Sequence, residues 1–161
     1  MRAAAFFTPW ADPEGLLVWL EATFGLPRAL FEGHRFWLRS DSGTLWLADA
    51  ATFPPPGVRL DAFGMLAFRD PPPRGRPTNV FALRFGAHAT RSVLDLDAAD
   101  ARRLLAGEPV AVTDAGEAGW RILRGPGQVL GMGRVAEGAL RSELPRSWLL
   151  DVDPATGWGD A

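Results

Sequence analysis

Arginine is the residue type best placed to do chemistry in this sequence, because it is concentrated in one glycine-rich segment near the C-terminus. Residues 119–150 hold five arginines against two glutamates, a local charge of +3. A guanidinium group donates two parallel hydrogen bonds to a phosphate, and a patch of arginines binds a nucleic-acid backbone in a salt-sensitive way. The segment therefore predicts an RNA-binding surface, although arginines that only keep a protein soluble would give the same count. The five arginines are Arg121, Arg124, Arg134, Arg141 and Arg146.

Two glycines, Gly131 and Gly133, lie inside a strand predicted over 128–138. Alternation places them on one face of that strand, with Met132 and Arg134 on the other. Glycines at alternate positions allow the close approach of a ligand, and a bent barrel strand needs the same freedom. The run also fits the dinucleotide pattern G-x-G-x-x-A, but no helix is predicted to start there and bind a pyrophosphate. We therefore include both glycines in the candidate RNA surface and expect no cofactor.

The sequence offers no coherent catalytic set. It contains no cysteine, which removes thiol nucleophiles, disulfides and cysteine-ligated metals. The histidines, His34 and His88, stand alone, and neither a G-x-S-x-G nor a P-loop pattern occurs. Asp95, Asp97 and Asp100 form an acidic cluster, but carboxylates at the start of a helix already have a capping role. The sequence therefore predicts a protein that is not an enzyme and binds no metal.

The composition bounds the size and class of the protein. The chain has 161 residues, 47% of them hydrophobic, and a formal charge of −2, so it can form one domain or two small ones. All 17 basic residues are arginine, a bias that GC-rich codon usage also produces. Prolines and acidic residues interrupt the apolar N-terminus before a signal-peptide core forms, and no stretch reaches the ~18 apolar residues of a membrane span. We therefore expect a cytoplasmic protein with no membrane partner.

Residues 1–70 predict a small α+β element made of a helix and a β-hairpin. The helix begins after Asp12, an N-cap followed by a proline, and ends at Gly25. Segments 35–39 and 44–49 flank a polar turn and predict the hairpin, and one or two further strands are expected before residue 70.

Tryptophans fall on both strands of this hairpin, at Trp37 and Trp46. Their spacing favours a cross-strand aromatic pair. The alternative is a base-stacking role in nucleic-acid binding.

The second half of the chain predicts a small barrel. A linker is expected over 71–78, a run of prolines with a glycine and two arginines. Residues 79–152 then predict short strands at regular spacing and one helix between Asp97 and Gly107, and an acidic tail follows over 153–161. The predicted strands are 79–86, 92–96, 109–113, 120–124 and 128–138.

A series of short motifs in this half has a recognisable order and spacing: Gly107-Glu108, Gly119-Trp120, Leu130–Arg134, Leu140-Arg141 and Pro145-Arg146. The series resembles the C-terminal RNA-binding domain of the Sun-type ribosomal RNA 5-methylcytosine methyltransferases, and the likeness extends over about residues 20–150. The resemblance implies a PUA-like small β-barrel with short helices, preceded by the helix and hairpin. The methyltransferase domain of that family is absent from this chain, and its catalytic cysteine with it.

We therefore expect a non-catalytic RNA-binding protein that contacts structured ribosomal or transfer RNA. The alternative is a protein-interaction module that acts with a separate RNA methyltransferase through exposed aromatic residues such as Trp10, Trp148 and Trp158. An enzyme of another kind would need a pocket with perturbed ionisable groups.

Overall fold

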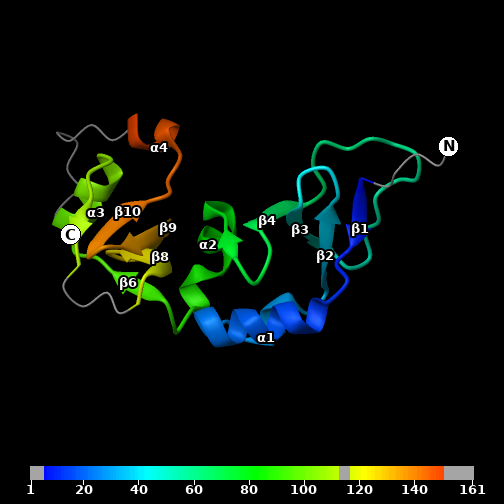
Figure 1. The fold of residues 1–161 in the computed structure, drawn as a ribbon, viewed down its shortest axis with the longest axis horizontal. Helices are drawn as coiled ribbons and strands as arrows, with labels where there is room; N and C mark the ends of the chain where they lie inside the picture. Colours follow the sequence, from blue (N-terminus) through cyan, green and yellow to red (C-terminus); the bar gives the residue numbers. More distant parts are fainter. Residues whose placement is uncertain (1–5, 113–116, 151–161) are drawn as a thin grey trace. The chain divides into compact units, whose positions relative to one another are not determined.

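The computed structural model describes residues 6–112 and 117–150, which form an α+β fold (Figure 1). The chain divides into two compact units, the first ending at Arg91 and the second beginning at Ser92. Every helix within the described ranges is too short or too polar to cross a lipid bilayer. The predicted acidic tail, 153–161, lies outside the described residues.

The first unit contains a five-stranded antiparallel sheet whose strands follow one another in chain order. Neighbouring strands are therefore joined by turns and loops, as in a meander. The strands are β1 (Phe7–Pro9), β2 (His34–Arg39), β3 (Thr44–Asp49), β4 (Met65–Asp70) and β5 (Arg76–Pro77).

Helix α1 (Pro13–Phe24) forms where its capping residues predict it. The Asp12 carboxylate accepts a hydrogen bond of 2.9 Å from the backbone N–H of Gly15, and Pro13 occupies the first helical position. Gly25 ends the helix in the left-handed conformation, with φ of +63°. A single turn of 3₁₀ helix, η1 (Arg28–Phe31), then leads into β2.

The predicted hairpin is confirmed as β2 and β3, and it pairs Trp37 directly with Trp46. Trp37 is buried and belongs to an aromatic cluster with Phe7 and Phe63. The cross-strand interpretation of the two tryptophans is thus confirmed, and burial gives Trp37 a role in the core of the first unit.

The strand predicted over 79–86 is wrong, because this segment is helix α2 (Asn79–Phe85) followed by η2 (Gly86–His88). The hydroxyl of Thr78 caps α2 by accepting a hydrogen bond of 3.2 Å from the N–H of Phe81. Phe81 and Phe85 are buried one helical turn apart, which is the spacing of a helix face.

The boundary between the two units also differs from the predicted linker at 71–78. Residues Arg76–Pro77 pair with β4 as strand β5, and Thr78 donates from its N–H to the carbonyl of Ala67 at 2.9 Å. Gly75 lies against the Trp19 ring, which leaves no space there for a Cβ. The proline-rich run is therefore packed into the first unit, which continues through α2.

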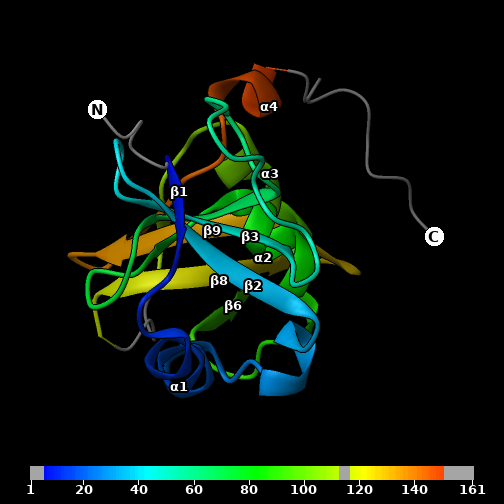
Figure 2. The same cartoon turned by 90° about the vertical axis from the view of Figure 1, so that its right-hand side faces the viewer.

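The second unit contains a mixed five-stranded sheet in the order β6-β8-β9-β10-β7, and the sheet is curled as in half of a barrel. Strand β6 runs parallel to β8, and the other described pairs of this sheet are antiparallel. Figure 2 shows β8 and β9, the longest pair, side by side. The strands are β6 (Val93–Asp95), β7 (Val110–Ala111), β8 (Gly119–Gly125), β9 (Gln128–Ala136) and β10 (Ala139–Ser142).

Two helices complete the second unit, α3 (Ala98–Leu105) and α4 (Arg146–Leu150). Asp97 caps α3 as predicted, since its carboxylate accepts a hydrogen bond of 2.8 Å from the N–H of Asp100. Ala101 and Leu104 turn one face of α3 into the core, where they pack with Leu123 and Leu140 of the sheet. The opposite face of the sheet is mixed, since it carries the buried Ile122 and Met132 as well as polar side chains.

Candidate nucleic-acid interface

Three residues on neighbouring strands form a row across the sheet of the second unit. Trp120 on β8 pairs directly with Arg134 on β9, and Arg134 pairs directly with Arg141 on β10. Directly paired residues project from the same face of a sheet. Arg134 and Arg141 are exposed and Trp120 is half-buried. We call these three residues the Trp-Arg row.

The guanidinium group of Arg134 lies over the Trp120 ring, with Cζ 5.7 Å from the ring centroid. This distance is within the range of a cation–π interaction. The row therefore combines two exposed cations with an aromatic side chain, the residue types that bind phosphates and stack on bases.

A bulge sets the register of this row. Near the turn Gly125 pairs with Gln128, but the register shifts between Leu123 and Arg124. Continuing the register of the turn would place Gly133, and not Arg134, opposite Trp120. One extra residue on β9 therefore moves Arg134 onto the face of Trp120.

Sequence reasoning named Trp120 only as part of a motif and missed it as a site residue. Counting residue pairs outward from the 125–128 turn places Trp120 opposite Gly133, one residue from its true partner Arg134. The bulge accounts for this difference of one residue.

Two of the arginines predicted to bind RNA form hydrogen bonds or an ion pair within the chain. Arg121 donates hydrogen bonds to the carbonyl groups of Trp120, at 2.9 Å, and Glu117. It pairs with Gly133, so it projects from the face opposite the Trp-Arg row. Arg124 forms an ion pair with Asp95, whose Oδ1 lies 3.0 Å from its Nε. Arg121 therefore ties the start of β8 to the segment before it, and Arg124 ties the end of β8 to β6.

Arg146 lies at the start of α4 and is exposed. Pro145 separates this helix from the sheet, and the carbonyl of Pro145 accepts a hydrogen bond of 2.9 Å from the N–H of Trp148. Arg146 is therefore presented on a separate element from the Trp-Arg row.

The glycines of β9 face the core of the second unit. A Cβ on Gly133 would lie 2.9 Å from methyl groups of both Leu123 and Leu140. Gly131 is buried and has φ of +142°, a conformation that favours glycine. The alternation predicted for Arg134 against the glycines is confirmed, and the side chains that approach Gly133 are the protein's own leucines.

The acidic cluster near α3 has structural partners. Asp95 pairs with Arg124, and Asp97 caps α3. Over the ranges that the structure describes, no group of three or more His, Cys, Asp or Glu side chains is arranged to hold a metal ion.

The curled sheet and the short helices place the second unit in the class of PUA-like β-barrel domains. Comparison with known proteins supports this class: residues 91–150 match the family model described as the PUA domain of the methyltransferase RsmF. The resemblance inferred from the sequence is thus confirmed, and the domain implies an RNA-binding role.

Curated relatives align over both units. The protein named ribosomal RNA small subunit methyltransferase F from Aeromonas salmonicida is 31% identical over 146 residues, which are 89% of this chain and 29% of the relative. The protein of the same name from Aeromonas hydrophila is 29% identical over 144 residues, with the same two shares. The chain therefore spans less than a third of the length of these relatives.

Proposed function

We propose that this chain is a non-catalytic RNA-binding protein that holds structured ribosomal or transfer RNA on the arginine surface of its PUA-like domain. The observation that carries the proposal is the Trp-Arg row on a domain of the RsmF PUA family. The name of the relatives, which refers to ribosomal RNA, favours that RNA as the first to test. The proposal places the protein in the cytoplasm with its RNA.

Arg134 and Arg141 carry the contact in this proposal, because both are exposed and direct neighbours. Arg146 adds a third cation from α4, whereas Arg121 and Arg124 hold the two ends of β8. Phosphate and shape contacts dominate over base reading, since the row offers guanidinium groups and no side-chain amides.

The non-catalytic part of the proposal rests on the chemistry that the sequence can supply. Cytosine methylation in the family that the domain resembles uses a cysteine nucleophile, and this chain has no cysteine.

A salt titration tests the proposal. Binding of the full chain to ribosomal RNA and to transfer RNA is measured by filter binding at rising KCl concentration. Two or three phosphate contacts predict a loss of affinity of about 10- to 40-fold between about 50 and 200 mM salt. Absence of binding above background at the low-salt end overturns the proposal.

A second candidate is a protein-interaction module that acts with a separate RNA methyltransferase. It is favoured by exposed apolar side chains, since Val80 and Leu83 are 50% and 45% exposed on α2 and Trp148 is 40% exposed on α4. Of the other two tryptophans proposed for such a face, Trp10 is half-buried and Trp158 lies outside the described residues. Copurification separates the candidates, because an apolar contact survives high salt and an arginine–phosphate contact weakens.

A further inference from the structure

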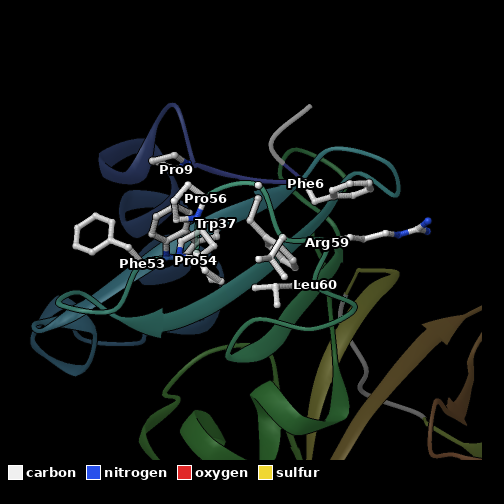
Figure 3. Close-up of a pocket in the computed structure, with 12 residues that line it drawn as sticks. Phe6, Pro9, Trp37, Phe53, Pro54, Pro56, Arg59 and Leu60 are labelled. Atoms are coloured by element: carbon white, nitrogen blue, oxygen red, sulfur yellow. The ribbon is translucent and has the colours of Figure 1, made fainter. Parts of the chain in front are cut away.

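The first unit contains a pocket that the proposed function does not use. It has a volume of about 620 Å³ and lies between the β-sheet and the loop that joins β3 to β4 (Figure 3). The volume is within the range of about 300–1,000 Å³ that is typical of small-molecule sites. Its walls are rings: Phe6, Trp37 and Phe53 with the proline run 54–56.

Packing and hydrogen bonds hold this pocket in shape. Phe63 supports it from the aromatic cluster, with its ring centroid 5.3 Å from that of Trp37. The loop then turns at Gly64, where φ is +77° and a Cβ would lie 2.3 Å from the carbonyl oxygen of Leu47. Arg39 donates a hydrogen bond to the carbonyl of Asp61. The loop therefore contacts both strands, β2 through the Arg39 hydrogen bond and β3 through the close packing of Gly64 against Leu47.

One polar group in the wall lacks a partner. Trp37 is 3% exposed, and its indole Nε1 is buried without a hydrogen-bond acceptor among the described residues. A buried N–H without an acceptor is unfavourable, so a ligand gains a hydrogen bond if the pocket opens enough for one of its acceptors to reach this atom.

The open ends of the pocket carry aromatic rings, each with a cation over it. Phe53 is 59% exposed, and the Cζ of Arg35 lies 4.9 Å from its ring centroid. The Cζ of Arg59 lies 5.1 Å from the centroid of Phe6. Figure 3 shows Phe53 at one end of the pocket and Phe6 with Arg59 at the other. Arg59 is the one charged side chain among the described lining residues.

We propose that this pocket binds an unstacked nucleobase of single-stranded RNA, with the adjoining phosphates on Arg35 and Arg59. A base has a flat apolar face for the rings and a carbonyl oxygen or ring nitrogen for the Trp37 N–H. Its phosphate matches the positive charge at the ends. The inference rests on the proposed function and extends it, because it gives the first unit a part in holding the RNA.

Charge decides between this ligand and a proline-rich peptide. Such a peptide also packs on aromatic rings and accepts a hydrogen bond from an indole N–H. It brings no negative charge, however, and would leave Arg35 and Arg59 without an anion. The described lining residues include no acid that would prefer a cationic or neutral partner.

The test uses the full chain with ¹⁵N-labelled tryptophan and reads the indole N–H signal of Trp37, assigned by its loss in Trp37→Phe. The probes are a single-stranded uridine decamer, an abasic decamer with the same phosphates, and a decaproline peptide. We expect the uridine decamer alone to move the Trp37 signal. Phe53→Ala and Arg59→Ala should each weaken its binding about fivefold or more, whereas the matched control Arg69→Ala, an exposed arginine on β4, should not.

Three outcomes overturn the inference: an equal shift with the abasic decamer, a shift with decaproline only, or a Trp37 signal that stays fixed while the uridine decamer binds. If the Trp37 signal stays fixed while the uridine decamer binds, and Arg134→Ala/Arg141→Ala abolishes that binding, the inference fails but the proposed function remains supported. Conversely, a shifted Trp37 signal in a protein that fails the ribosomal and transfer RNA titration overturns the proposed function and supports the pocket.

Discussion

Arg134 lies over the ring of Trp120, its direct partner across β8 and β9, with Cζ 5.7 Å from the ring centroid. The ring limits the conformations of a long side chain that would otherwise lose entropy on binding a phosphate. Arg141, on the other side of Arg134, completes the row. We therefore regard Trp120 as a positioning residue for Arg134, the arginine proposed to contact RNA.

Removing both arginines of the row should weaken RNA binding and flatten its salt dependence. Arg134→Ala/Arg141→Ala deletes two exposed cations, so the slope of log K against log salt should fall by about 1 for each phosphate that the variant no longer neutralises. The measurement is filter binding to ribosomal RNA at several KCl concentrations.

The matched control removes the same charge from another part of the second unit. Arg102 and Arg103 are exposed on α3. If Arg102→Ala/Arg103→Ala lowers the affinity and the slope equally, net charge and not the Trp-Arg row determines binding.

The pairing of Trp120 with Arg134 should appear as a coupling energy in the free protein. A double-mutant cycle of Trp120→Leu and Arg134→Ala, read as the free energy of unfolding in urea, should give about 0.5–1 kcal/mol, as for an exposed cation–π pair. A coupling within error of zero would show that the ring does not hold the guanidinium group.

Features coded by neighbouring residues were predictable from the sequence. Asp12 and Asp97 mark helix starts because a capping carboxylate acts on an N–H three residues away. The turn between the hairpin strands fixes the Trp37–Trp46 register in the same local way.

Features set by distant contacts were not predictable. The 79–86 segment is an exception, because the Thr78 cap and the spacing of Phe81 and Phe85 are local signals of a helix that its apolar run concealed. The bulge on β9 leaves Leu130 unpaired, in a core cluster with Ala101 and Leu104 of α3, which are distant in the sequence. The pocket needs β1, β2 and a loop that are far apart in the sequence.

Gly133 is expected to matter for stability, because a side chain at this position has no space in the core. Gly133→Ala would place a methyl group 2.9 Å from side-chain atoms of Leu123 and Leu140. Overpacking of this kind costs about 1–3 kcal/mol of unfolding free energy, measured by urea denaturation. Adding Leu123→Val should restore part of the loss. A loss of RNA affinity in a fully stable Gly133→Ala protein would instead assign this glycine to the binding surface.

Acid should loosen the contact between Arg39 and Asp41 at the end of β2. The Arg39 guanidinium donates hydrogen bonds of 2.8 and 3.1 Å to the two carboxylate oxygens of Asp41, and these bonds lower the pKa of Asp41 below its ordinary value of 3.8. Because the folded-state pKa is the lower one, the stabilisation is complete above pH 3.8 and disappears as the pH falls through the folded pKa.

The stability difference between the native protein and Asp41→Asn should therefore stay constant at neutral pH and shrink below pH 3.8. Unfolding free energy measured against pH gives this difference, and the carboxyl ¹³C signal of Asp41 reports its titration directly. Since Arg39 also donates to the carbonyl of Asp61, Asp41→Asn should speed amide exchange in the loop that forms the pocket. Titration of Asp41 at or above its ordinary pKa, or unchanged exchange in that loop, would contradict this link.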